Sequence, residues 1–175
     1  MLPFPFHFSM GSNVFLFFFL FFSFLFFFFF GNVGRMSHND AIGFLGSVVA
    51  AAFTAYAIRD IPPQQWGKKM MTEIIPKADK YVKDTGRNYD LYQEGWKYFV
   101  DHWKAYLTLR QLTEGGPPQF PPNYGVAERD QFYTSISMNG WGGASGHDST
   151  IIALVLLIPH KRTPRSKFCF LPFLF

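Results

Sequence analysis

The chain has 175 residues, the size of a single domain, and its aromatic fraction of 21% is unusually high. The formal net charge is +4, but residues 35–148 are neutral, with 12 Lys or Arg and 12 Asp or Glu, and the whole excess lies after residue 160. This central region has no basic patch with interleaved aromatic residues, which argues against nucleic-acid binding, and the single Cys169 excludes an intrachain disulfide and a Cys-rich metal site.

The first 34 residues contain no Asp, Glu, Lys or Arg, and 15 of the 24 Phe lie in residues 1–30. Residues 14–30 are apolar except for Ser23 and would span about 26 Å as a helix. Three interpretations stay open: a translated polypyrimidine tract beside a splice site, a membrane segment, or a signal peptide. The absence of a basic stretch argues against a signal peptide, and Phe is a mediocre helix former. The first interpretation is favoured because Phe, Leu and Ser share pyrimidine-rich codons.

Residues 41–58 are predicted to form a helix without any charged side chain. The candidate N-cap residues are Ser37, Asn39 and Asp40. A stripe of small residues at helical spacing lets a second helix pack closely: Gly43, Gly46, Ala50 and Ala57. The segment is long enough to cross a membrane, but its moderate hydrophobicity favours a central buried helix of a bundle.

Residues 64–75 are predicted to form a short helix, which Pro76 then restarts. Its inward side chains are expected to be Trp66, Met70, Met71, Ile74 and Ile75. Residues 77–84 are charged, and they are expected to form one or two solvated turns that end at Gly86.

Residues 88–112 form the clearest periodic helix of the chain. Aromatic side chains recur at spacings of three and four along one face, which predicts a core stripe: Tyr92, Trp96, Phe99, Trp103 and Tyr106. Charged pairs three residues apart are expected on the other face, Glu94 with Lys97 and Asp101 with Lys104. His102 is expected at the surface or edge.

A proline-rich connector at residues 115–122 precedes a predicted short helix over residues 127–137. Four glycines then lie within residues 140–146. The pair Asp148-Ser149 is expected to cap a following apolar helix. A glycine-rich loop that ends at a helix start suits a phosphate or a sugar hydroxyl, although most such loops are only turns.

After residue 158 no element with sensible caps or amphipathicity is predicted. The expected organisation is therefore a Phe-rich apolar segment over residues 1–33, a helical domain fragment over residues 34–158 and an unstructured tail over residues 159–175.

The residues alone do not predict a catalytic centre. Ser145, His147 and Asp148 have the residue types of nucleophilic catalysis, but neighbours in sequence rarely face one another as a triad does. The acids are scattered singly, so neither paired carboxylates for a glycosidic bond nor several acids converging on a metal are predicted. The residues alone therefore predict a helical domain fragment whose glycine-rich loop is a candidate for ligand contact.

Residues 34–153 resemble the ADP-ribosylglycohydrolase family, and within it the hydrolases that act on ADP-ribosylarginine. The resemblance rests on four stretches in unbroken order: residues 35–38 (Arg-Met-Ser-His), 53–57 (Phe-Thr-Ala-Tyr-Ala), 65–68 (Gln-Trp-Gly-Lys) and 129–148. It implies an all-α fold, a cytoplasmic enzyme, and hydrolysis of the N-glycosidic bond of ADP-ribosylated arginine on proteins with magnesium as cofactor. A membrane location is expected only if residues 14–30 are expressed.

The resemblance also implies which residues contact the ADP-ribose. These substrate-binding positions are His38, beside Ser37, and Met138, Asn139, Gly140, Ser145 and Gly146 in the glycine loop. Met138 and Asn139 stand where the family is expected to have Tyr-Ser.

Two departures from the family pattern concern its chemistry. The Asp-Asp-Thr and Asp-x-Asp-Ser/Thr elements that hold the metal ions in the family are absent from this chain, so no catalytic or metal-binding residue is predicted here. The chain as given is therefore expected to be inactive. The alternative interpretation is a non-catalytic short isoform, which binds ADP-ribose or acts as a membrane-associated interaction protein.

Overall fold

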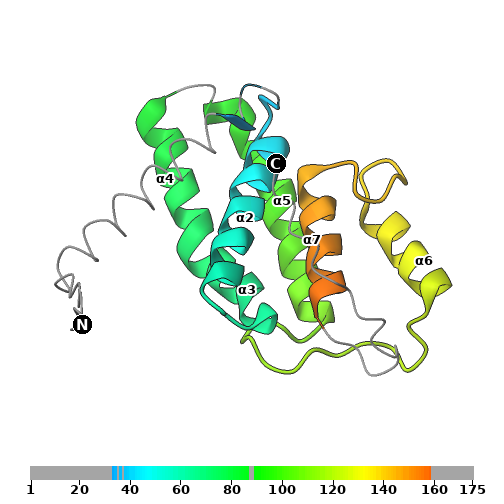
Figure 1. Ribbon diagram of the computed structural model, residues 1–175. Helices are drawn as coiled ribbons and strands as arrows, with labels where there is room; N and C mark the ends of the chain where they lie inside the picture. The colour runs from blue at the N-terminus through cyan, green and yellow to red at the C-terminus, as the bar shows by residue number, and fades with distance from the viewer. Residues whose placement is uncertain (1–32, 35, 37, 87–88, 159–175) are drawn as a thin grey trace, which may run out of the picture.

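The computed structural model describes residues 33–34, 36, 38–86 and 89–158. The expectations for residues 1–32, for Ser37 and for the tail at 159–175 therefore lie outside the described residues. Within the described ranges the regular elements are helices and there is no strand, which confirms the all-α prediction (Figure 1).

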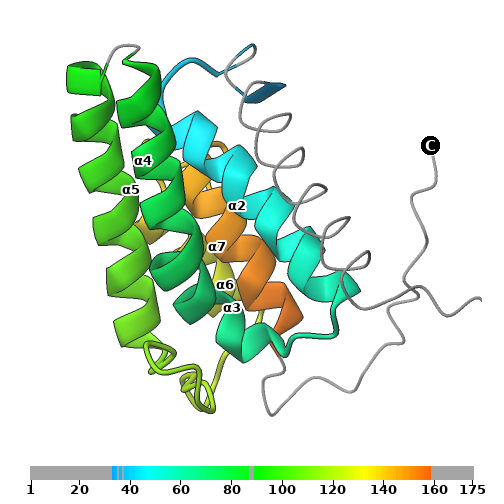
Figure 2. The same ribbon diagram turned by 90° about the vertical axis from the view of Figure 1, so that its left-hand side faces the viewer.

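Helix α2, Ala41–Ile58, has the predicted bounds and packs against α5 and α7 (Figures 1 and 2). It begins at Asp40, whose Oδ1 accepts a hydrogen bond from the N–H of Gly43 at 2.9 Å. Among the described residues α2 alone is long and apolar enough to span a membrane, with a mean hydropathy of 1.9, yet half of it is buried inside the protein. Its packing against α5 and α7 supports the interpretation of a central core helix.

The next helical rod has three parts: α3 (Pro63–Lys69), a π-helical turn η1 (Met70–Ile74) and α4 (Ile75–Thr85). The helix restarts at the proline as predicted, because α4 begins at Ile75 with Pro76 in its first turn. The π turn widens the backbone immediately before the proline, so the missing N–H and the ring are accommodated without a break. Gly86, with φ 61°, ends the rod as predicted.

The inward face of this rod is mostly as predicted, because Trp66, Met70, Ile74 and Ile75 are buried while Met71 is half-buried. The charged stretch from residue 77 to 84 is less solvated than expected. Ala78 and Val82 in it are buried in the core.

Helix α5, Tyr89–Leu109, carries the predicted aromatic stripe. Tyr92, Phe99, Trp103 and Tyr106 are buried, and Trp96 is half-buried against the core. The charged pairing on the other face differs from the expected pairs three residues apart. The Lys97 Nζ lies 2.6 Å from the Asp101 carboxylate, which is four residues further along the helix.

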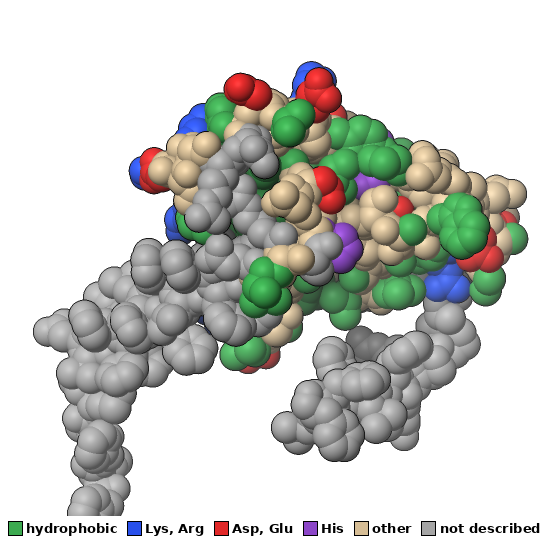
Figure 3. All heavy atoms as spheres, turned by 90° about the horizontal axis from the view of Figure 1, so that it is seen from above, with side chains coloured by type: hydrophobic (Ala, Val, Ile, Leu, Met, Phe, Trp, Pro, Cys, Tyr) green, Lys and Arg blue, Asp and Glu red, His purple; other side chains and the backbone are tan. Residues whose placement is uncertain are grey.

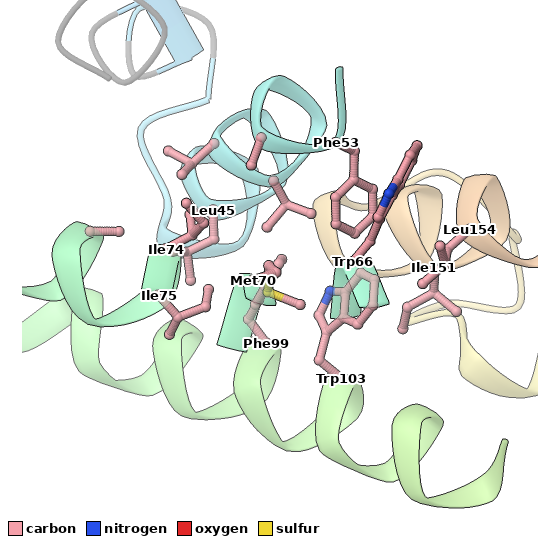
Figure 4. Close-up of a cluster of buried hydrophobic side chains, with 14 of the residues drawn as sticks. Leu45, Phe53, Trp66, Met70, Ile74, Ile75, Phe99, Trp103, Ile151 and Leu154 are labelled. Atoms are coloured by element: carbon pink, nitrogen blue, oxygen red, sulfur yellow. The ribbon is translucent and has the colours of Figure 1, made fainter. Parts of the chain in front are cut away.

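The core lies where α2, the α3–η1–α4 rod, α5 and α7 meet (Figure 4). Trp103 is at its centre: its ring lies edge-on to Phe53 at 5.8 Å and to Tyr106 at 5.8 Å, and it is 0% exposed. The same burial raises the pKa of the Tyr106 hydroxyl. Aromatic side chains packed in this way bury large apolar areas and so stabilise the fold.

One buried arginine fixes the connector between α5 and α6 (Val126–Ile136). The guanidinium of Arg110 lies 4.7–4.8 Å from the ring centroids of Phe120, Tyr124 and Phe132, and its Nη2 donates to the Tyr124 hydroxyl at 3.1 Å. Cation–π contact with three rings offsets part of the cost of burying the charge. This anchor sets where α6, and therefore the glycine loop after it, leaves the helical body.

Candidate functional site

A cleft of about 490 Å³ lies at the end of the molecule where α2 and α7 (Gly146–Leu157) both begin (Figure 1). Figure 3 looks down on this end, where histidine side chains are exposed among backbone, small polar and hydrophobic groups. The described residues that line the cleft are His38, Asp40, Ile42, Gly43, Gly46, Ser47, Ala50, Met138, Gly143, Ala144, Ser145, Gly146, Ser149 and Thr150.

The floor of the cleft is a glycine–glycine contact between α2 and α7. A Cβ placed on Gly46 would lie 2.5 Å from the Cα and 2.8 Å from the carbonyl oxygen of Gly146. A Cβ on Gly146 would overlap the carbonyl oxygen of Ile42. Because both partners lack a side chain, the two backbones touch, and the first turn of α7 is fixed against α2.

Helix α7 begins three residues earlier than the apolar pattern suggests. The expected capping by Asp148 and Ser149 is wrong: the N-cap is Ser145, and Asp148 lies inside the first turn. The Asp148 Oδ1 accepts a hydrogen bond from the Ser145 N–H at 2.9 Å, as an N3 acid does in a capping box. Gly146, the first residue of α7, lines the cleft, and its N–H is one of those at a helix start that have no partner within the helix.

The structure brings together four of the six residues predicted to bind substrate. His38, Met138, Ser145 and Gly146 line the cleft, whereas Asn139 and Gly140 are exposed and do not line it. Gly140 adopts φ 77°, so its role in the loop is a turn that other residues rarely make.

Several lining residues were not predicted from the sequence, among them Ser47 on α2 and Ser149 and Thr150 on α7. On α2 a signal was present, because Gly43, Ser47 and Ala50 follow the helical spacing of the small-residue stripe. On α7 the expected cap at Asp148-Ser149 placed Ser149 before the helix, so the sequence did not indicate that residues 149 and 150 share a helix face.

Behind the loop lies a polar cluster of His147 and Asp148 with the half-buried Tyr98 and His102. His147 and Asp148 are both 0% exposed. The rings of Tyr98 and His102 each lie 5.0 Å from the His147 ring, edge-on or nearly so. Burial lowers the pKa of His147 below its ordinary 6.5, with the Ile136 carbonyl and Asp148 opposing that shift. Burial, and then the Asp148 charge, raises the pKa of Tyr98.

The carboxylates are spread away from the cleft. All 12 Asp and Glu of the chain lie within the described residues, and five of them form ion pairs with lysines: Glu73, Asp79, Asp84, Asp101 and Glu114. Asp40 is the one acid among the described lining residues. In the part of the chain that the structure describes, no group of three or more His, Cys, Asp or Glu is arranged to hold a metal. These residues do not fit the magnesium site that the resemblance implies.

No protein-family model matches the chain. Over 142 residues it is 46% identical to ADP-ribosylhydrolase ARH1 of Dictyostelium discoideum, a match that covers 71% of this chain and 36% of that protein. Over 124 residues it is 28% identical to a protein of Acanthamoeba polyphaga mimivirus named as an ADP-ribosyl glycohydrolase, covering 68% of this chain and 24% of the viral protein. The chain is thus similar to proteins named for acting on ADP-ribosyl groups, and it spans well under half of the length of either.

Proposed function

We propose that this chain is part of an ADP-ribosylglycohydrolase and that its cleft binds the ADP-ribose group of the substrate. The observation that carries the proposal is the coincidence of two facts. The chain is 46% identical to a named ADP-ribosylhydrolase, and four of the six residues that the resemblance assigns to ADP-ribose line one cleft: His38, Met138, Ser145 and Gly146.

The chemistry of the cleft supports an anionic, hydroxyl-rich ligand. The first turn of α7 offers backbone N–H groups and the positive end of a helix dipole, which suit a diphosphate. The hydroxyls of Ser47 and Ser149 can exchange hydrogen bonds with ribose hydroxyls or phosphate oxygens. The volume of about 490 Å³ lies within the range usual for sites of small ligands.

A finer proposal concerns the substrate and the chemistry. We propose arginine-linked ADP-ribose on proteins as the substrate class, with magnesium as the cofactor of the complete enzyme. Because the acids of this chain do not converge, the metal would be held by residues matching parts of the relatives that lie beyond this chain. The role of the cleft residues is then to bind and orient the ADP-ribose while the bond to arginine is broken.

The chain by itself is expected to bind without cleaving. Hydrolysis of the N-glycosidic bond needs an activated water and an acid–base pair, and Asp40 is the one carboxylate among the described lining residues. Incubation of the full chain with ADP-ribosyl-arginine and Mg²⁺ is expected to release no ADP-ribose above the rate without protein. Release that depends on the chain and on Mg²⁺ would contradict this prediction.

Ser149 allows a test of the proposed ligand. It is half-buried on the cleft wall in the second turn of α7, where an acid is compatible with the helix dipole. Ser149→Glu is expected to weaken ADP-ribose binding at least about tenfold, because its charge faces the diphosphate. Calorimetric titration measures the affinity, and Ser149→Gln is the control, with similar size and no charge. Equal affinities for the Glu and Gln variants would sink the proposed placement of the diphosphate.

A further inference from the structure

Two consecutive residues of the first turn of α7 hold the two ends of the glycine loop. At the entrance, His147 Nε2 bonds the carbonyl oxygen of Ile136, the last residue of α6, at 2.9 Å. At the exit, Asp148 Oδ1 accepts from the Ser145 N–H at 2.9 Å. Both side chains are fully buried, whereas residues 138–144 between them are exposed. Between these ends the loop approaches α6 at Gly142, where an added Cβ would lie 2.9 Å from the Tyr133 Cβ, so the two end contacts are the described side-chain hydrogen bonds that tie the loop to α7.

The contact at the entrance defines the state of the imidazole. A carbonyl oxygen can only accept, so His147 Nε2 carries the proton and donates it to Ile136. The other nitrogen, Nδ1, is buried and has no hydrogen-bond partner among the described residues. Protonation at Nδ1 would place a charge in a buried site, which is disfavoured there by desolvation.

We propose that His147 is a positioning residue of the cleft: as a neutral donor it clamps the loop entrance to α7, and this keeps Met138 on the cleft wall. The role in ligand binding rests on the function proposed above, whereas the clamp itself does not. His147 does not line the cleft, so it acts through the loop.

The clamp predicts a pH dependence with a defined sign. When the loop entrance opens, His147 becomes solvated and takes up a proton at its ordinary pKa of 6.5, whereas in the closed state its pKa is lower. The contribution of His147 to the closed state is therefore complete above about pH 6.5. It is lost as the pH falls through the lowered pKa that His147 has in the closed state. The groups that face the ring are Tyr98 and His102 of α5, the Ile136 carbonyl of α6 and the neighbouring Asp148; α2 approaches this turn with Ile42 and Gly46, which do not titrate.

The test compares two substitutions in the full chain. His147→Leu keeps an apolar side chain of similar bulk but removes the donor, and His147→Gln places an amide donor near the position of Nε2 without a titratable group. Hydrogen–deuterium exchange of residues 137–145, corrected for the intrinsic rate, is measured from pH 7 to pH 5. His102→Gln is the matched control, because His102 bonds the Tyr98 carbonyl of its own helix.

In the wild type and in His102→Gln, loop exchange is expected to rise as the pH falls. In His147→Leu it is expected to be at least about tenfold faster at pH 7, with exchange in α5 unchanged. His147→Gln is expected to restore slow exchange and to remove the pH dependence. An unchanged loop in His147→Leu, a loop in His147→Gln as fast as in His147→Leu, or a pH dependence that survives in His147→Gln would overturn the proposal. If His147→Leu does not fold, the pH profile of His147→Gln alone decides.

The same variants are titrated with ADP-ribose, with an expected tenfold loss of affinity in His147→Leu and recovery in His147→Gln. Absence of any ADP-ribose binding by the wild type overturns the proposed function, while the exchange data still decide the clamp. Wild-type binding that His147→Leu leaves unchanged overturns the role of the clamp in the cleft.

Discussion

Gly46→Val is expected to destroy the packing of α2 against α7 and to lower the free energy of unfolding by at least about 3 kcal/mol. The new Cβ would lie 2.5 Å from the Cα and 2.8 Å from the carbonyl oxygen of Gly146, and both are backbone atoms of a helix that cannot rotate away. The helices must separate to admit the side chain, which also opens the floor of the cleft. Urea unfolding followed by circular dichroism measures the loss.

A matched control separates this contact from the general effect of replacing glycine. Gly116 lies in the connector, and a Cβ there would meet no atom within 4 Å. Gly116→Ala is therefore expected to change the stability by no more than about 0.5 kcal/mol. If Gly46→Val were as stable as Gly116→Ala, the described contact between α2 and α7 would be wrong.

Trp103→Ala is expected to lower the free energy of unfolding by about 3–5 kcal/mol. The side chain is 0% exposed and packs against Phe53, Phe99 and Tyr106, so its removal leaves a cavity among rings that cannot collapse into it. The indole N–H has no hydrogen-bond partner in the described part of the chain, which places the expected loss toward the lower end of this range. The same urea titration measures the change.

Trp141 is the control for the second substitution, since it is the same residue type and is 77% exposed. Trp141→Ala is expected to alter the stability by no more than about 0.5 kcal/mol. Similar losses for the two tryptophans would contradict the placement of Trp103 at the centre of the core.

The helices were predictable where a local pattern decides them. Helix α2 begins at a capping aspartate and ends where a proline pair interrupts the chain, so its bounds follow from neighbours in sequence. The buried face of α5 follows from aromatic residues at spacings of three and four, a period that no strand shares. These features depend on residues within one or two turns of each other.

The cleft depends on contacts that a local pattern does not contain. Gly46 and Gly146 are 100 positions apart, and their sequence surroundings say only that each is small. The bond from His147 to Ile136 spans 11 residues, and no periodicity marks it. The predicted start of α7 is too late for a related reason. Glycine is a poor helix former, so Gly146 was assigned to the loop.

The dependence on contacts distant in sequence also explains why four lining residues could be assigned by resemblance and the remaining lining residues could not. His38 and Ser145 belong to stretches that are read directly from the sequence. Ser149 reaches the cleft only because α7 begins at Gly146 and turns that face toward α2. A resemblance assigns a role to individual matching residues, whereas helix packing decides which other residues line the cleft.

The most direct test of the central claim, that the cleft binds ADP-ribose, is the calorimetric titration of the full chain with ADP-ribose, with AMP as the comparison ligand. The expected result is saturable binding at one site, tighter for ADP-ribose than for AMP and weakened by Ser149→Glu. Absence of saturable binding, or binding that Ser149→Glu leaves unchanged, would contradict the claim.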